Sequence, residues 1–363
     1  METVSKYEEI VNWIKSEMKK GSLRPGDKME SEHQLCDRFQ VSRQTVRHAI
    51  SILEKEGIVE RRRGSGTYIR LSLKVEEKEK KTMLVAVMTT YTDEYIFSAI
   101  IKGIEQELSK AGYGMQVSFT NNTVEKERFI LKRILEQGMV DGLIAEPTKS
   151  GLPNPNLDIY RKIMEKGIPV LFINSHYNGL EAPYVSLDDK LAGKMITNHL
   201  LLCGHRKIGA IFKADDGQGH QRYAGYIEAL MESDIRINSK SVVWIDTDEV
   251  SNMWEDASRI LRRLKGCTAC VCYNDEIASA FVAICLEQRI KVPEHISVIS
   301  IDDSNLANYC EVPLTSAKNP AYDLGKIAAN HMVEMINGHS VPMATKLNPE
   351  IVNRNSVTII NSI

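Results

Sequence analysis

The sequence predicts an α/β protein in which a small winged helix-turn-helix domain is followed by a two-lobed α/β domain with parallel sheets. Two observations carry this prediction. Residues 25–68 contain two short helices and a basic, glycine-tipped hairpin in close succession, an order typical of DNA-reading domains. From residue 83 onward, short apolar runs alternate with amphipathic segments, a pattern typical of parallel sheets covered on both faces.

The N-terminal helices can be placed from apolar spacing and capping residues. Residues 7–20 repeat apolar side chains near the helical period, as at Ile10 and Ile14. Ser31 and Ser42 each precede a further helix, where their hydroxyls can accept hydrogen bonds from exposed amides. We therefore expect three helices, of which the third begins after Ser42.

The third helix, residues 43–56, has the features of a DNA-recognition helix. Its core face is apolar, whereas Arg43 and Gln44 stand in its first turn, where such side chains can make paired hydrogen bonds to base edges in a major groove. Residues 58–70 then alternate like strands, and three arginines lead into a glycine tip. Such a tip can approach a phosphate or a minor groove closely, so these residues predict a wing.

The order and spacing of these elements, in PGDKMESEHQLCDRFQVSRQTVRHAISILEKEGIVERRRGSGTYI, resemble the winged helix-turn-helix of the GntR family of bacterial regulators. The resemblance covers residues 1–70 and implies double-stranded operator DNA as a partner. It also implies a set of DNA contacts on the helices and in the wing: Glu32, Arg43, Gln44, Thr45, Arg47, Arg63 and Gly64.

Composition and charge describe an ordinary globular protein with one basic region. The chain has 363 residues, of which 43% are hydrophobic and 26% charged, and its net charge is -2. Residues 1–72 nevertheless carry 14 basic and 11 acidic groups, so the basic region coincides with the predicted DNA-binding domain. No apolar run approaches the ~18 residues of a membrane span, and the N-terminus is polar. We therefore expect a cytoplasmic protein with no membrane partner.

The cysteines predict neither a metal site nor disulfides. Of the seven cysteines, Cys267 and Cys270 form a CxxC pair, but no second pair or histidine cluster stands at zinc spacing. We expect free thiols and no cofactor.

The larger domain is expected after a linker. Residues 71–82, with the charged core KVEEKEKK, lack apolar periodicity and are predicted to connect the domains. Residues 83–363 then contain eight apolar runs that predict strands: MLVAVM, MQVSFT, GLIAE, VLFIN, KIGAIF, SVVWID, ACVCYN and SVISID. This pattern exceeds one sheet, so we expect two lobes with a cleft between them.

Polar residues follow several of these runs, where open α/β sheets bind their ligands. Carboxylates, carboxamides and a guanidinium stand there beside aromatic rings. This combination suits a polyhydroxyl ligand such as a sugar, because each hydroxyl both donates and accepts hydrogen bonds. The competing interpretation is that polar loops simply follow strands, and that four of the carboxylates cap helices: Asp189, Asp216, Asp275 and Asp303.

A second resemblance supports the sugar interpretation. HQRYAGY, CYNDEIA, ISVISIDDSNLANY and PLTSAKNP resemble the effector-binding domain of the LacI/GalR family, which is itself similar to periplasmic sugar-binding proteins. The resemblance implies a periplasmic-binding-protein-like body with three crossings between lobes. It places lobe 1 at about 83–187 and 319–345, and lobe 2 at about 188–317 and 348–363.

The same resemblance implies sugar contacts by Asn174, Arg222, Asn274 and Asp302. The aromatic position that this family places near its ligand falls at about Ala321, so a ring must come from elsewhere. We expect Tyr91, Tyr95 or Phe97 to supply it, and take Tyr95 as the candidate.

The pairing of these two domain types, together with TTYTDEYIF, GLIAEPTKS and IFKADDGQGHQR, resembles the repressors of arabinose-utilisation genes. This implies L-arabinose as the effector, with Glu146 and Lys149 helping to select it. Another sugar, or a sugar phosphate, stays open as an alternative. A single head makes too few base contacts for selective binding, so we expect a homodimer on a pseudo-palindrome. We expect sugar to release the DNA, although a corepressor response is not excluded.

Two other classes of protein are disfavoured. A sugar receptor for transport would share the body but would need a secretion signal and would have no use for the head. A pyridoxal-phosphate enzyme fused to such a head would need a Schiff-base lysine and a phosphate-binding loop, and neither pattern is evident. No P-loop, HExxH or GxSxG is present either, so we predict no enzymatic activity.

Overall fold

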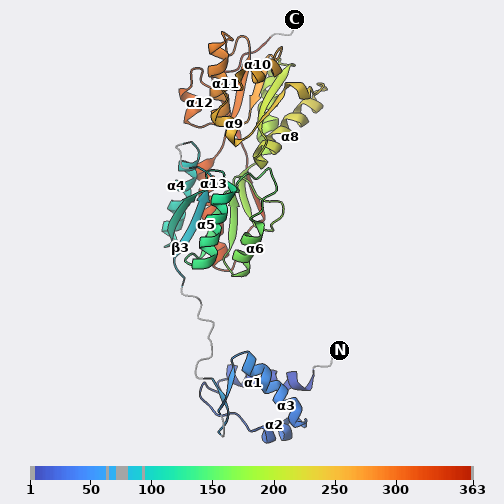
Figure 1. The fold of residues 1–363 in the computed structure, drawn as a ribbon, viewed down its shortest axis with the longest axis vertical. Helices are drawn as coiled ribbons and strands as arrows, with labels where there is room; N and C mark the ends of the chain where they lie inside the picture. Colours follow the sequence, from blue (N-terminus) through green and yellow to red (C-terminus); the bar gives the residue numbers. More distant parts are fainter. Residues whose placement is uncertain (1–4, 63–64, 71–80, 92–94, 361–363) are drawn as a thin grey trace. The chain divides into compact units, whose positions relative to one another are not determined.

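The fold in Figure 1 is that of a computed structural model, which describes four stretches of the chain: residues 5–62, 65–70, 81–91 and 95–360. They belong to two compact units, the head (Met1–Lys81) and the body (Thr82–Ile363). The predicted wing contacts Arg63 and Gly64, and most of the predicted linker, lie outside the described residues. None of the described helices is long and apolar enough to cross a membrane.

The head is a winged helix-turn-helix, as predicted. Its elements are α1 (Lys6–Lys19), α2 (Glu32–Phe39), α3 (Arg43–Lys55), β1 (Val59–Arg62) and β2 (Gly66–Ile69). The two strands pair antiparallel, with Val59 opposite Ile69. The predicted caps are confirmed, because the hydroxyls of Ser31 and Ser42 accept hydrogen bonds from the Gln34 and Thr45 amides of their helices.

The described residues of the body form two six-stranded sheets, one in each lobe. The first sheet is parallel throughout and has the strand order β13-β7-β6-β5-β3-β4. Its strands are β3 (Leu84–Thr89), β4 (Gly114–Phe119), β5 (Gly142–Ala145), β6 (Val170–Ile173), β7 (Tyr184–Leu187) and β13 (Ala344–Leu347).

Helices cover both faces of the first sheet. α4 (Phe97–Lys110) and α13 (Ala321–Ile336) share an apolar core with Val85 and Val87 of β3. α5 (Val124–Gln137) and α6 (Leu157–Glu165) share another with Ala86 and Met88. Alternate residues of one strand thus enter separate cores, which explains why the strand is apolar throughout.

The second sheet has the order β14-β12-β11-β10-β8-β9 and is parallel except for β14, which runs antiparallel to β12. Its strands are β8 (Ile208–Lys213), β9 (Val242–Ile245), β10 (Ala269–Cys272), β11 (Ser297–Asp302), β12 (Thr315–Lys318) and β14 (Glu350–Val352). The accompanying helices are α7 (Asp189–Leu202), α8 (Gly217–Glu232), the 3-10 helix Ser239–Ser241, α9 (Thr247–Ser251), α10 (Ala257–Arg263), α11 (Asp275–Glu287) and α12 (Asn305–Tyr309). In Figure 1, α8 and α11 lie on either side of this sheet.

All eight predicted apolar runs form strands, which confirms the predicted α/β body. Four further strands, β7, β12, β13 and β14, were not marked by apolar runs. They lie where the chain passes between the lobes: after β7, between β12 and α13, and between β13 and β14.

In each lobe, two helices cross at a pair of glycines. A Cβ on Gly193 of α7 or on Gly225 of α8 would overlap a backbone carbonyl of the other helix. Gly103 of α4 and Gly325 of α13 are related in the same way in the first lobe. Because these glycines have no side chains, the two backbones touch, and this contact determines how each pair of helices packs.

Candidate functional site

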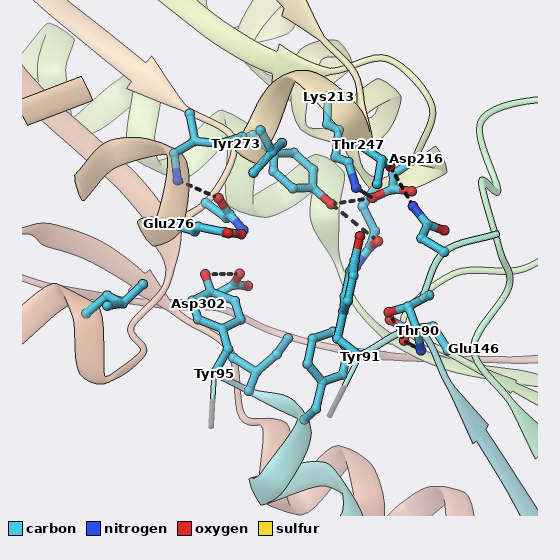
Figure 2. Close-up of a pocket in the computed structure, with 18 of the residues that line it drawn as sticks. Thr90, Tyr91, Tyr95, Glu146, Lys213, Asp216, Thr247, Tyr273, Glu276 and Asp302 are labelled. Atoms are coloured by element: carbon cyan, nitrogen blue, oxygen red, sulfur yellow. Dashed lines mark hydrogen bonds and ion pairs between the residues drawn. The ribbon is translucent and has the colours of Figure 1, made fainter. Parts of the chain in front are cut away.

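A cavity of about 530 Å³ lies between the lobes, beside the carboxyl ends of strands from both sheets. Its described lining residues are Thr90, Tyr91, Tyr95, Ile96, Phe97, Asn122, Glu146 and Pro147 from the first lobe, and Lys213, Asp216, Gln218, Arg222, Thr247, Val250, Ser251, Tyr273, Asn274, Glu276, Ile277, Asp302, Asn305 and Leu306 from the second. Figure 2 shows the polar groups at both ends of the cavity, with tyrosine rings among them.

Arg222 is the most deeply buried charge in this cavity, with 1% of the residue exposed. Its Nε donates to Asp189 Oδ1 over 2.8 Å, its Nη1 to the Tyr273 carbonyl over 2.6 Å, and its Nη2 lies 3.4 Å from Asp302 Oδ1. The guanidinium also lies 4.6 Å from the centre of the Tyr273 ring. Although burial opposes its charge, the carboxylates of Asp302 and Asp189 hold the pKa of Arg222 above its ordinary value.

The position of Arg222 follows from the glycine crossing of α7 and α8. Asp189 begins α7 and Arg222 stands on α8, so close contact of the two backbones brings the ion pair together. The competing cap interpretation is wrong for Asp189, Asp275 and Asp303. The residues at the caps of α7, α11 and α12 are Asp188, Asn274 and Ser304, while Asp216 stands at the cap of α8 without a capping hydrogen bond.

Tyr95 and Asp302 join the two lobes at one side of the cavity. The Tyr95 hydroxyl donates to Asp302 Oδ2 over 2.7 Å and accepts from the Asp275 amide over 3.2 Å. Burial, followed by the charge of Asp302, raises the pKa of Tyr95, so the phenol keeps its proton. Asp302 has a φ of 112°, a strained backbone conformation of the kind that gathers at functional sites.

Glu146 stands at the other end of the cavity and is 6% exposed. Its carboxylate accepts hydrogen bonds from the Thr90 amide (2.8 Å), the Thr90 hydroxyl (2.6 Å) and Asn174 Nδ2 (2.8 Å). Burial nevertheless raises the pKa of Glu146. Asn174 does not line the cavity, so it holds Glu146 from behind.

The cavity brings together five of the seven predicted effector residues: Tyr95, Glu146, Arg222, Asn274 and Asp302. Asn274 lines the cavity while its Oδ1 caps α11 by accepting from the Ile277 amide. Lys149 and Asn174 are not among the lining residues. Lys149 points to the second lobe instead, with Nζ 3.7 Å from Asp215 Oδ2.

Sequence reasoning missed several polar residues of this cavity: Thr90, Asn122, Lys213, Gln218, Thr247, Tyr273, Glu276 and Asn305. Lys213 ends β8 and Tyr273 follows β10 directly, so their places at strand ends could have indicated them. Lys213 Nζ donates to Asp216 Oδ2 over 2.8 Å, and the Tyr273 hydroxyl donates to the same oxygen over 3.2 Å.

Acidic groups outnumber basic ones around the cavity. Among the lining residues that the structure describes, Lys213 and Arg222 are basic, and the acidic ones are Glu146, Asp216, Glu276 and Asp302. Each basic group is itself within 4 Å of two carboxylates. The site therefore favours a neutral polar ligand over an anion.

Three of the predicted DNA contacts are exposed on α3. Arg43, Gln44 and Arg47 are exposed, whereas Val46, Ala49, Ile50 and Leu53 of the same helix are buried. Glu32 of α2 accepts a hydrogen bond from Arg47 Nε over 2.9 Å. Thr45 lies 2.9 Å from Ser42, hydroxyl to hydroxyl, within the cap of α3.

The sulfur atoms of Cys270 and Cys272, both on β10, lie 3.9 Å apart. All seven cysteines are free thiols. Among the described residues, no cluster of histidine, cysteine, aspartate or glutamate side chains could hold a metal ion.

A winged helix-turn-helix head on a periplasmic-binding-protein-like body defines a ligand-responsive DNA-binding regulator. Residues 6–69 match the family of bacterial regulatory proteins called gntR, and residues 197–357 match the periplasmic binding protein-like domain. The chain belongs to the family of arabinose metabolism transcriptional repressors. It is therefore a sugar-responsive transcriptional repressor and not an enzyme.

Two relatives and one solved structure carry this assignment. The chain is 36% identical to the arabinose metabolism transcriptional repressor of Geobacillus stearothermophilus, and the match covers 98% of each. It is 39% identical to that of Halalkalibacterium halodurans, over 93% of this chain and 90% of the relative. The crystal structure of the transcription regulator CcpA of Lactococcus lactis is 28% identical, with a TM-score of 0.68 over 76% of this chain and 98% of that one.

Proposed function

We propose that L-arabinose binds in the interlobe cavity and releases the protein from operator DNA. The observation that carries this proposal is the cavity itself, whose polar groups are dense and whose cations are outnumbered by carboxylates. A neutral polyhydroxyl ligand fits such a lining, whereas a sugar phosphate would meet a net negative site. The choice of L-arabinose is supported by the named function of the two relatives.

The proposed sugar contacts follow from the hydrogen-bonding capacity of the lining. Arg222 is a fixed donor, Asp302 and Glu146 are acceptors, and Asn274 and Tyr95 add polar groups at the Asp302 end. Asn174 holds Glu146 in place through its amide. Ring faces of Tyr91, Tyr95 and Phe97, which all line the cavity, supply apolar surface for the sugar.

The proposed response is a change in how two heads are spaced. The protein acts in the cytoplasm as a homodimer whose heads read two halves of a palindromic operator. Sugar favours one arrangement of the lobes, which the chain connects at three crossings. A change in this arrangement would move the surfaces of the body that form the dimer. By linkage, sugar and operator weaken each other equally, and a coupling of about 1–3 kcal/mol suffices.

Calorimetric titration tests the effector. The full chain is titrated with L-arabinose, D-xylose, D-galactose, D-glucose and D-arabinose 5-phosphate. Saturable heat with L-arabinose alone is the expected result. If a different neutral sugar saturates the protein, that sugar is the effector, and the preference of the site for a neutral ligand still holds. Tight binding of D-arabinose 5-phosphate would contradict both the choice of L-arabinose and the preference for a neutral ligand.

Sugar affinity should depend on pH through Glu146. A sugar hydroxyl that donates to this carboxylate favours its ionised form, so sugar binding lowers the pKa that burial has raised. Affinity therefore falls as the pH drops through that raised pKa, above the ordinary glutamate value. Glu146→Gln should bind about 10- to 100-fold more weakly at neutral pH, because a charge-assisted hydrogen bond is lost. Its affinity should depend less on pH between pH 7 and pH 5 than that of the wild type, and the dependence that remains belongs to Asp189 and Asp275, whose pKa values burial raises to about 6. A pH slope equal to that of the wild type would contradict the role of Glu146.

DNA recognition should depend on Gln44 near the start of α3. Gln44 is exposed, and an amide paired to a base edge contributes about 1–3 kcal/mol of discrimination. Gln44→Ala should therefore weaken operator binding about 5- to 150-fold while leaving nonspecific binding nearly unchanged. Lys55→Ala, at the exposed far end of the same helix, is the control, measured by fluorescence anisotropy. Equal losses in the two variants would place the base contact elsewhere.

A further inference from the structure

One edge of the cavity is bridged by direct hydrogen bonds between the lobes. The bridging residues, which we call the rim latch, are Asn122 and 149–151 of the first lobe, and 215–217 and Thr247 of the second. Only Asn122, Thr247 and Asp216 of this set are among the described residues that line the cavity. The rim latch therefore borders the ligand space at one edge, and most of its residues lie outside the cavity lining.

Three hydrogen bonds and one ion pair cross between the lobes in the rim latch. Asn122 Nδ2 donates to the Thr247 hydroxyl over 2.7 Å. The Gly151 amide donates to the Asp215 carbonyl over 3.0 Å. The Gly217 amide donates to the Ser150 hydroxyl over 2.9 Å, and Lys149 Nζ lies 3.7 Å from Asp215 Oδ2.

Each side of the rim latch is also held within its own lobe. In the first lobe, the Lys149 amide donates to Asn122 Oδ1 over 2.8 Å. In the second, the amide and hydroxyl of Thr247 donate to Asp215 Oδ2 over 3.1 and 2.6 Å. Asn122 and Lys149 have φ values of 51° and 44°, so the first-lobe side holds two residues in a strained conformation. Hydrogen bonds within each lobe thus hold the two sides of the rim latch in the conformation in which they contact each other.

The two glycines of the rim latch have no room for a side chain. A Cβ on Gly151 would lie 2.9 Å from the Ala214 carbonyl oxygen and 3.0 Å from the carbonyl carbons of Asp215 and Asp216. These atoms are backbone of the opposite lobe and cannot rotate away. A Cβ on Gly217 would lie 2.9 Å from the Ser175 hydroxyl of the first lobe. Neither glycine has a positive φ, so close approach of the lobes is what requires glycine here.

We propose that the rim latch holds the lobes together around the bound sugar and sets how slowly the sugar leaves. This assigns Lys149, Ser150, Gly151 and Gly217 as positioning residues that do not touch the sugar. A sugar that contacts Asn122 or Thr247 is linked to the latch directly. The proposal rests on the proposed function insofar as the ligand is a sugar.

Sugar dissociation rates test the rim latch. Gly151→Ala should still admit the sugar but prevent the lobes from meeting at this edge, so dissociation should accelerate about tenfold or more. Ser150→Ala removes one hydrogen bond without adding an atom and should accelerate dissociation about fivefold. Stopped-flow measurements on the full chain, with L-arabinose as the probe, give both rates.

Lys149 has a matched control in the same lobe. Lys149→Met should accelerate dissociation about threefold, because its ion pair with buried Asp215 is lost. Lys162 lies at the same distance, 3.7 Å, from Asp158, but both of those side chains are exposed and remote from the cavity lining. Lys162→Met should therefore leave dissociation unchanged. Equal rates in wild type, Gly151→Ala and Lys149→Met would overturn the proposal.

Amide hydrogen exchange separates this proposal from the choice of sugar. The latch predicts slow exchange at the Gly151 and Gly217 amides in the sugar-free chain, and faster exchange at Gly217 in Gly151→Ala, with unchanged thermal unfolding. If no tested sugar binds the wild type, the proposed effector is wrong. Amide hydrogen exchange alone then tests whether the rim latch holds the lobes together. Unprotected glycine amides in the wild type would overturn the latch whatever the ligand.

Discussion

Replacing Arg222 with methionine is expected to abolish the response to sugar and to lower the free energy of unfolding of the body by about 3–5 kcal/mol. Arg222 is 1% exposed and lies between Asp189 and Asp302. Its removal leaves two buried carboxylates without their cation, which is the costly way to break a buried ion pair. Thermal unfolding monitored by circular dichroism, together with calorimetric titration, measures both effects.

A second substitution separates the two roles of Arg222. In the double variant Asp189→Asn, Arg222→Met, one of the two uncompensated charges is also removed, so part of the stability should return. Sugar binding should not return, because the donor that faces the cavity is still missing. A single variant that unfolds like the wild type, or a double variant that binds sugar normally, would contradict this account of Arg222.

Gly225→Ala is expected to destabilise the body by about 3 kcal/mol and to weaken sugar binding at the same time. The added methyl group would overlap the Lys190 carbonyl of α7, and neither backbone can yield without separating the helices. Separation of α7 from α8 moves Asp189 away from Arg222, whose Nε–Oδ1 distance is 2.8 Å. The midpoint of thermal unfolding should fall by roughly 6–12 °C, at about 2–4 °C per kcal/mol.

Gly325→Ala is the matched control for this prediction. Gly325 of α13 meets the Ile100 carbonyl of α4 in the same way, but in the first lobe. Its substitution should cost similar stability but weaken sugar binding less than Gly225→Ala does. It displaces α4, which begins at the cavity residue Phe97, but it leaves the Arg222–Asp189 pair of the second lobe in place. If both glycine variants lost sugar binding equally, general destabilisation would account for the loss, and the link from helix crossing to Arg222 would be wrong.

Local patterns in the sequence predicted the elements that are buried on both faces but marked none of the strands at the lobe crossings, whose places came only from the resemblance to the LacI/GalR family. Apolar runs identified β3–β6 and β8–β11, because strands covered on both sides need apolar residues throughout. β12 reads TSAK, β13 reads ATKL and β14 reads EIV. These short, partly polar strands form because they pair with neighbouring strands of the sheet. The residue pattern of a single segment contains no information about such neighbours.

The sequence predicted several residues of the candidate site, but it did not predict how these residues contact one another. Inspecting strand ends indicated Asp302 and Asn274, and the same rule, applied after MQVSFT and SVVWID, would also have indicated Asn122 and Thr247. No local pattern could show that these last two bond to each other across 125 residues of chain. Nor could it show that Lys149 faces Asp215 rather than the cavity, since that depends on how the lobes meet.

The central claim is that sugar in the body weakens DNA binding by the head, and one titration tests it most directly. The full chain is bound to a fluorescent duplex that the protein has itself selected from a random pool, and L-arabinose is added while anisotropy is recorded, with D-glucose as the control. The account predicts that operator affinity falls about 5- to 150-fold with L-arabinose alone. An operator affinity that is unchanged, or that rises, when L-arabinose saturates the protein would contradict it.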